Sequence, residues 1–203
     1  MTRKEEIIRA ALELASENGL KAVTLSQIAD RIGIKKPSLY NHFKSKDELV
    51  NGMYSALREH AKQNGNSPPD FSALADKSLE EILLLSLQGY LRFLTDKDML
   101  CFFRVLYSER STSPAAARIM LDETDRMVES TRALFYALVV HGKMKNEDVD
   151  TAALSYAMAV HSLVDCHIDK ATAGCSDISD ICTISEDMRK YIAWFSRHME
   201  VQS

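Results

Sequence analysis

The scarcity of residues that make turns is the feature that most limits how this chain can fold. Seven glycines and four prolines are spread over 203 residues. A β-sandwich or β-barrel of this length needs a turn roughly every 8–12 residues, and glycine and proline mark most such turns. The sequence therefore predicts long helices and an all-α fold.

Helix start signals support this prediction. Four segments fit the capping box, in which Ser or Thr is followed three residues later by Glu or Gln; they begin at Thr2, Thr24, Ser45 and Ser78. Each precedes apolar residues at helical spacing. About nine helices are expected, over residues 3–18, 25–32, 37–43, 46–63, 79–94, 97–109, 114–141, 147–171 and 184–199. Residues 64–70 form a predicted linker, and residues 172–182 a predicted loop.

Composition excludes several classes of protein. The chain is 46% hydrophobic and 27% charged, as is usual for a soluble globular protein. No apolar stretch reaches the roughly 20 residues that cross a membrane, and the amphipathic start is no signal peptide. We therefore expect a cytoplasmic protein whose four cysteines, Cys101, Cys166, Cys175 and Cys182, are thiols.

Residues 25–43 have the pattern of a helix-turn-helix. Two short predicted helices flank a turn that contains Gly33, and Leu39 and Phe43 are placed to face the core. A polar, partly basic face of this kind suits the major groove of DNA, where phosphates and base edges both accept hydrogen bonds. A three-helix bundle with a solvated face is the alternative. The donors on the exposed face are Lys35, Lys36, Ser38, Tyr40, Asn41 and His42.

Local charge agrees in sign with a DNA-binding N-terminus. Residues 1–48 contain nine basic and seven acidic residues, a formal charge of +2, whereas the remainder carries −6. The asymmetry is small, but local charge is what matters for nucleic-acid binding.

The segment from Thr24 to Leu49, TLSQIADRIGIKKPSLYNHFKSKDEL, resembles the signature of the TetR family of bacterial transcriptional regulators. The resemblance covers about residues 5–52. The matching pieces are Ile28-Ala29, Gly33-Ile34, Leu39-Tyr40, His42-Phe43, Lys46 and Leu49. It implies a homodimeric repressor that binds a palindromic operator, with a DNA-binding domain over residues 1–48 and a ligand-binding and dimerisation domain over residues 49–203.

The resemblance also implies roles for individual residues. Thr24 and Ser26 would meet a phosphate at a helix N-terminus. Lys36, Pro37 and Ser38 would approach base edges, whereas Tyr40, His42 and Lys46 match positions that usually touch phosphates. Lys35 and Asn41 complete the set. The family often has a small residue where Lys35 or Lys36 stands, so the exact base contacts stay open.

The last two long predicted helices carry apolar stripes. In the family this pair builds the dimer interface, and a two-fold dimer suits a palindromic operator. Packing within the chain is the alternative. The residues expected at the interface are Tyr156, Val160, Leu163, Val164, His167, Tyr191, Ile192 and Phe195.

The predicted helices between residues 79 and 141 are rich in aromatic and methionine side chains, Tyr90 among them. Such side chains suit an adaptable pocket for a small, largely apolar effector, although they are equally typical of a plain core. The pocket candidates are Phe103, Tyr107, Met120, Met127 and His161.

Signals for metal binding or catalysis are weak. His161 and Asp165 have metal-ligand spacing, but no Cys-x-x-Cys or His-x-x-x-His pair accompanies them. The sequence has no glycine-rich phosphate loop or nucleophile elbow. We therefore expect no metal, no cofactor and no enzyme. The alternatives are a metal- or thiol-responsive regulator, an activator, and a helical-bundle binding or catalytic protein with a vestigial helix-turn-helix.

Overall fold

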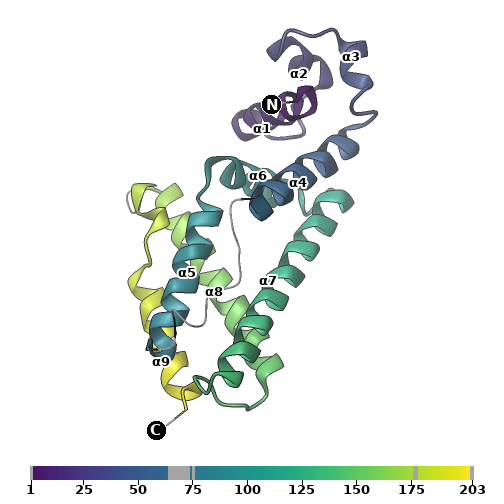
Figure 1. Cartoon of the computed structure of the whole chain (residues 1–203). Helices are drawn as coiled ribbons and strands as arrows, with labels where there is room; N and C mark the ends of the chain where they lie inside the picture. Colours follow the sequence, from purple (N-terminus) through teal and green to yellow (C-terminus); the bar gives the residue numbers. More distant parts are fainter. Residues whose placement is uncertain (1, 64–73, 75, 176–177, 202–203) are drawn as a thin grey trace. The chain divides into compact units, whose positions relative to one another are not determined.

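The computed structural model describes residues 2–63, 74, 76–175 and 178–201 (Figure 1). Its helices are α1 (Arg3–Asn18), α2 (Leu25–Arg31), α3 (Lys36–Tyr40), α4 (Lys46–Gln63), α5 (Leu79–Leu94), α6 (Lys97–Glu109), α7 (Pro114–Val140), α8 (Val149–Thr172), the 3-10 helix η1 (Ile178–Cys182) and α9 (Glu186–Met199). Among the described residues, β-structure is limited to one isolated bridge between Met144 and Glu200. The predicted all-α fold is confirmed.

Local capping explains where the helices begin. Thr2, Thr24 and Ser78 each form a complete capping box with the Glu or Gln three residues later. At α4 the box is incomplete, because the Glu48 backbone N–H donates to Ser45 Oγ at 3.1 Å whereas the Glu48 carboxylate accepts from the backbone N–H of Lys44 at 2.7 Å. The Glu48 carboxylate thus accepts from the N–H of Lys44, one residue before the N–H of Ser45 that the capping-box motif predicts.

Several predicted boundaries were wrong by a few residues. Helix α3 ends at Tyr40 instead of near residue 43. Helix α8 begins at Val149 instead of 147, because Asp148 adopts a left-handed conformation (φ 42°, ψ 52°) that no α-helix continues through. The predicted loop 172–182 contains η1. The predicted linker 64–70 lies outside the described residues.

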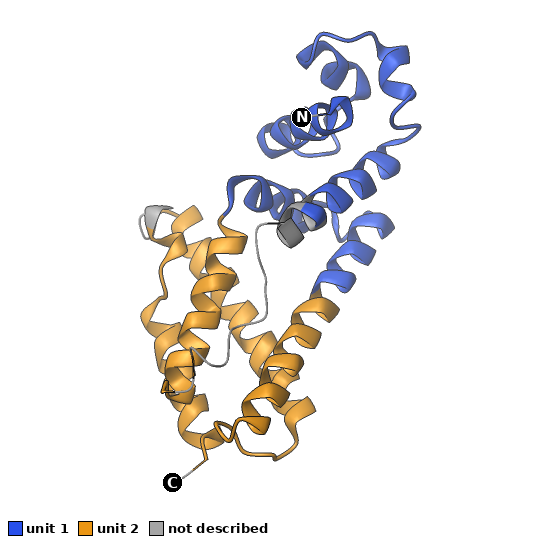
Figure 2. Ribbon diagram, viewed as in Figure 1, with its two compact units in different colours: residues 1–67, 96–123 blue, residues 68–95, 124–203 orange. Residues whose placement is uncertain are grey.

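The chain forms two compact units (Figure 2). Unit 1 consists of residues 1–67 and 96–123, so it joins α1–α4 to α6 and the start of α7. Helix α1 packs against α2, α4 and α6, and α4 also packs against α6. The fully buried side chains at its centre include Ile7, Leu39, Phe43, Met53 and Phe102.

Unit 2 consists of residues 68–95 and 124–203. Helix α9 packs against α5 and α8, and η1 packs against the same two helices. An aromatic cluster lies between α7, α8 and α9, in which the Tyr156 and Phe195 ring centroids are 4.8 Å apart and those of Phe135 and Tyr156 are 5.3 Å apart. Burial and the nearby Tyr191 raise the pKa of Tyr156.

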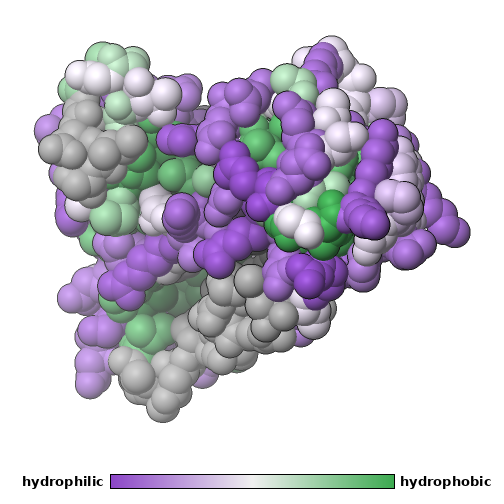
Figure 3. All heavy atoms as spheres, turned by 90° about the horizontal axis from the view of Figure 1, so that it is seen from above, coloured by the Kyte–Doolittle hydropathy of each residue, from purple (hydrophilic) through white to green (hydrophobic). Residues whose placement is uncertain are grey.

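One face of the molecule is seen in the space-filling view of Figure 3. Hydrophilic side chains cover much of the face seen in Figure 3, with apolar areas between them. Within the described residues, no helix combines the length and the apolar character needed to span a membrane.

Candidate nucleic-acid interface

The turn between α2 and α3 has the geometry of a Schellman motif. Gly33 adopts φ +68°. Its backbone N–H donates to the carbonyl of Asp30 at 3.2 Å, and the N–H of Ile34 donates to the carbonyl of Ala29 at 2.9 Å. These two hydrogen bonds end α2 and redirect the chain into α3. A left-handed residue is needed at this point, and glycine adopts that conformation at the least cost.

Burial of one face fixes the orientation of α3. Leu39 and Phe43 are 0% and 1% exposed. The Phe43 ring packs against Gly52 of α4, and the ammonium of Lys4 lies 5.3 Å from the centroid of that ring. Because these contacts hold one side of the helix in the core, its other side must face solvent.

The predicted DNA-facing residues lie mainly on that outer side. Lys35, Lys36, Pro37, Tyr40 and Asn41 are exposed, and Ser38 and His42 are half-buried. Pro37 occupies the second helical position, one later than predicted. The structure thus brings the predicted donors of α3 together on one surface.

The two residues at the start of α2 are placed differently from each other. Thr24 is the N-cap, and its hydroxyl accepts from the backbone N–H of Gln27 at 3.2 Å. Ser26 is half-buried in the first turn. The first-turn N–H groups of Leu25 and Ser26 have no acceptor within the helix, which is the property that suits a helix N-terminus to a phosphate.

Lys46 differs from the other predicted DNA contacts. It is half-buried, and its Nζ donates to the backbone carbonyl of Lys21 at 3.3 Å. Burial lowers the pKa of Lys46, and the charge of Glu109 opposes that change. The sequence contained no sign of this arrangement, because Lys21 is 25 residues away in the chain.

The pocket candidates in unit 1 are Phe103, Tyr107 and Met120. Phe103 is half-buried beside Phe102, with ring centroids 5.9 Å apart. The Arg110 guanidinium lies 4.6 Å from the centroid of the Tyr107 ring. Met120 is 9% exposed.

The pocket candidates in unit 2 are Met127 and His161, and Tyr90 of α5 joins them. Its Oη lies 3.1 Å from His161 Nδ1 and 3.7 Å from Met127 Sδ. Asp165 Oδ2 is 3.6 Å from His161 Nε2. The i, i+4 spacing of His161 and Asp165 was visible in the sequence, and Tyr90 belonged to the aromatic set from which a pocket was predicted. The contacts of Tyr90 with His161 and Met127 could not be predicted from the sequence, because these residues are 71 and 37 positions away in the chain.

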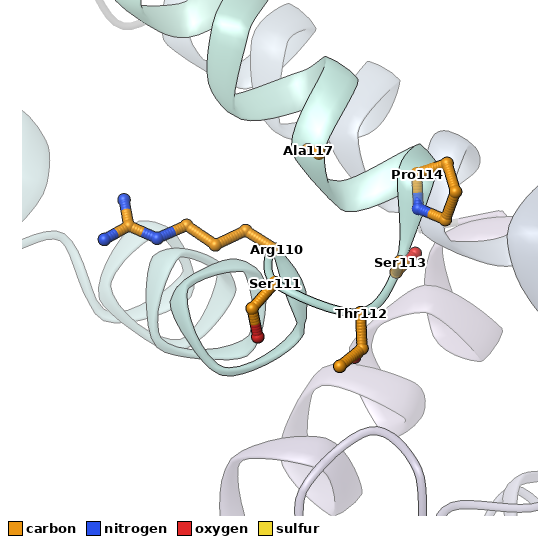
Figure 4. A pocket seen from close by; sticks show the side chains of 6 residues that line it. All are labelled: Arg110, Ser111, Thr112, Ser113, Pro114 and Ala117. Atoms are coloured by element: carbon orange, nitrogen blue, oxygen red, sulfur yellow. The ribbon is translucent and has the colours of Figure 1, made fainter.

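One open depression of about 230 Å³ lies at the junction of α6 and α7 (Figure 4). It does not include any of the pocket candidates. Figure 4 shows the Arg110 side chain extending away from Ser113 and Pro114. The lining residues are Arg110, Ser111, Thr112, Ser113, Pro114 and Ala117.

The stripe expected at the dimer interface is mostly buried within the single chain. Tyr156 of α8 and Phe195 of α9 pack against each other and against Phe135 of α7, so this part of the stripe is packed within the chain, which is the alternative that the sequence left open. Leu163 and Tyr191 are half-buried. Six residues are less than 9% exposed: Tyr156, Val160, Val164, His167, Ile192 and Phe195.

Different apolar residues of α8 and α9 face outward. Leu154 and Met158 are 50% and 43% exposed, and Trp194 is 49% exposed. Single large apolar side chains on a surface are common. Leu154 and Met158, however, are four residues apart and therefore lie next to each other on the same exposed face of α8.

The histidines and cysteines do not assemble into a metal site in the part of the chain that the structure describes, where no three His, Cys, Asp or Glu side chains gather. Cys166, Cys175 and Cys182 are exposed and Cys101 is half-buried. His167 Nε2 lies 2.9 Å from the carbonyl oxygen of Asp180 in η1, which gives this histidine a structural role.

Comparison with known proteins agrees with the helix-turn-helix. Residues 7–53 match the family described as bacterial regulatory proteins, tetR family, and residues 81–167 match the AefR-like transcriptional repressor, C-terminal domain. Over 55 residues the chain is 38% identical to tetracycline repressor protein class C from Escherichia coli, covering 27% of this chain and 25% of that protein. Over 88 residues it is 36% identical to the HTH-type transcriptional repressor KstR2 from Rhodococcus jostii, covering 39% of this chain and 43% of that protein.

A solved structure extends the likeness to the whole chain. A TetR family transcriptional regulator from Pseudomonas syringae pv. tomato is 25% identical, with a TM-score of 0.66 and 100% of both chains covered. The matched segments span between a quarter and a half of the two curated relatives. The fold and the exposed helix α3 define a DNA-binding regulator of transcription. The chain belongs to the TetR family of bacterial transcriptional regulators.

Proposed function

We propose that this regulator is a cytoplasmic repressor that binds a palindromic operator as a homodimer, has no catalytic activity and is released by a small effector. The observation that carries the proposal is the exposed, basic outer face of α3, held by the turn at Gly33. An activator would use the same face, and no observation favours a catalytic role. The functional division proposed is DNA binding by residues 1–48 and effector binding with dimerisation by residues 49–203.

The contacts to DNA follow from position on the helix. Lys36, Pro37 and Ser38 open α3 and are proposed to approach base edges in the major groove. Tyr40, the last residue of α3, and His42, two residues beyond it, are proposed to contact phosphates. The remaining proposed contacts are Thr24, Ser26, Lys35, Asn41 and Lys46.

The homodimer is proposed to use the outward face of α8 and α9. Leu154, Met158 and Trp194 are the large apolar side chains exposed there. Covering them with the same face of a second chain removes apolar surface from water and gives a two-fold arrangement. This face replaces the stripe expected from the sequence, because most of that stripe is already covered within the chain.

The proposed effector is largely apolar with one or two polar groups. Two observations within unit 2 support it: the Met127 side chain beside Tyr90, and the hydrogen-bonding group formed by Tyr90 and His161. Apolar walls with few polar groups suit such a molecule better than a sugar or nucleotide, which needs many directed donors. By linkage, the factor by which the effector weakens DNA binding equals the factor by which DNA weakens effector binding.

Two experiments test this function. Selection of duplexes from a random DNA pool by the full-length protein should yield a palindromic site, and a shift assay on that site should show binding as a dimer. A thermal-shift screen should find apolar compounds that raise the melting temperature and release that DNA. Failure to enrich any duplex would argue against DNA-binding regulation. Stabilisation by polar metabolites or metal ions alone would overturn the apolar effector.

A further inference from the structure

The first turn of α1 carries four charged side chains, and three of them have partners nearby in the chain. The Arg3 guanidinium forms an ion pair with Glu6, and the Glu5 carboxylate accepts from the backbone N–H of Thr2 at 2.7 Å. The fourth is Lys4, which is exposed and forms no ion pair with any residue that the structure describes. Its charge is therefore available to an anion outside the chain.

An aromatic ring holds the Lys4 ammonium beside the end of α3. The ammonium lies 5.3 Å from the centroid of the Phe43 ring, within the roughly 6 Å over which a cation is attracted to an aromatic face. The backbone N–H of Phe43 donates to the carbonyl of Leu39 at 3.0 Å, and that of His42 donates to the same carbonyl at 2.9 Å. These two hydrogen bonds join Phe43 to the last turn of α3. The ring contact therefore fixes the position of Lys4 relative to that helix.

The end of α3 is also where two of the proposed phosphate contacts lie. Tyr40 is exposed and is the last residue of the helix, and His42 follows it by two residues. Successive phosphates of one DNA strand are about 3.4 Å apart along the helix axis. A cation beside these two residues can thus meet a neighbouring phosphate while α3 stays in place. A lysine ammonium, a compact charge with three donors, suits a phosphate oxygen.

We propose that Lys4 of α1 binds a phosphate of the DNA backbone next to those held by Tyr40 and His42. The inference rests on the proposed DNA-binding function of α3 and extends the interface to α1, outside the segment 24–46 that contains all the other proposed contacts. A phosphate contact carries no sequence information, so Lys4 adds affinity without base preference. The contact with Phe43 orders the side chain before DNA arrives, which lowers the entropy lost on binding.

The dependence of binding on salt tests the phosphate contact. On a random-sequence duplex, Lys4→Met should lower the slope of log affinity against log salt by about one unit. Lys4→Arg keeps both the charge and the ability to stack on Phe43, so it should keep the wild-type slope. The matched control is Arg9→Met, which removes an exposed charge about 140° further around α1 and should also keep the slope. An unchanged slope in Lys4→Met would overturn the proposal.

Chemical labelling of lysine amines provides a second readout in the unaltered protein. Acetic anhydride acetylates exposed lysines, and mass spectrometry measures the extent at each position with and without a duplex. DNA should protect Lys4 from acetylation. Lys190, an exposed lysine of α9 in unit 2, is the control and should be labelled equally in both samples. Equal labelling of Lys4 with and without bound DNA would contradict a contact at this amine.

Two further measurements separate this inference from its alternatives. The melting temperature of Lys4→Met should stay close to that of the wild type, because the side chain is exposed, so a lower slope then reports the lost phosphate and not a damaged fold. Binding by the wild-type protein with an unchanged slope in Lys4→Met would overturn the role of Lys4 alone. Absence of any duplex binding by the wild-type protein would overturn the proposed function and this inference with it.

Discussion

Gly52 and Phe43 are in such close contact that a side chain at position 52 has no room. A Cβ atom built on Gly52 would lie 2.5 Å from Cε1 of Phe43 and 3.2 Å from its Cζ. Real Cβ atoms almost never come so near to a carbon, so either the ring or α4 would have to move. The glycine at position 52 thus allows Phe43, three residues beyond the end of α3, to pack directly on α4.

Replacing Gly52 by Ala should therefore destabilise unit 1. Overpacking costs about 1–3 kcal/mol, which exceeds the roughly 1 kcal/mol that Ala gains over Gly inside a helix. Thermal unfolding measures the difference. The control is Gly89→Ala in α5, where no atom lies within 4 Å of the added Cβ, and this variant should gain stability. An equal gain in stability for Gly52→Ala and Gly89→Ala would show that the Phe43 ring moves aside at no cost in free energy.

Residues at the start and end of α3 should affect DNA binding in different ways. Tyr40→Ala should weaken binding by the same factor on a selected operator and on random DNA, because a phosphate contact carries no sequence information. Lys36→Ala should instead alter base preference, with a cost of about 1–3 kcal/mol on the preferred site. Fluorescence anisotropy on both duplexes measures these ratios. An unchanged preference in Lys36→Ala would remove this residue from base recognition.

Charge on α8 should separate folding from dimerisation. Met158→Glu places a carboxylate on the exposed face, so the fold should persist while the dimer is lost. Val160→Asp places an unpaired charge at a position 7% exposed in the single chain, which costs several kcal/mol and should unfold unit 2. Sedimentation and circular dichroism distinguish the two outcomes. A folded dimer in Met158→Glu would exclude this face as the interface.

Trp194 offers an internal probe of the same interface. It is the only tryptophan in the chain and is 49% exposed. If α9 meets its partner through this face, dilution into the monomer range should shift Trp194 fluorescence to longer wavelength. A spectrum independent of concentration, while sedimentation reports dissociation, would place Trp194 outside the contact.

Alkaline pH should destabilise unit 2 through Tyr156. Its pKa is raised by burial, whereas an unfolded tyrosine titrates near 10. The unfolded chain therefore loses the proton first, and the free energy of unfolding falls as pH rises above about 10. Tyr156→Phe cannot lose this proton, so its stability should decline less steeply over that range. Equal slopes of melting temperature against pH for the wild type and Tyr156→Phe would contradict the raised pKa of Tyr156. Tyr40→Phe is the control, because it removes an exposed tyrosine hydroxyl.

Local sequence signals located the helices and the exposed face of α3. The capping boxes at Thr2, Thr24 and Ser78 fixed three helix starts, because both partners of each box lie within four residues. The same holds for the turn at Gly33, whose hydrogen bonds join neighbouring residues. The exposed face of α3 followed from helical spacing once Leu39 and Phe43 were placed in the core.

Tertiary structure decided what covers each apolar face and where charged groups find partners. Spacing marked Tyr156, Val160 and Phe195 as a stripe but contained no information on whether this chain or a second one would cover it. Long-range pairs are equally invisible to local patterns: Tyr90 meets His161 from 71 residues away, and Lys46 meets Lys21 from 25. The sequence by itself thus determined the helices and the exposed face of α3, because their causes are local. Only packing between distant helices decided which side chains of α8 and α9 are buried, the polar contact at His161 and the hydrogen bond from Lys46 to the Lys21 carbonyl.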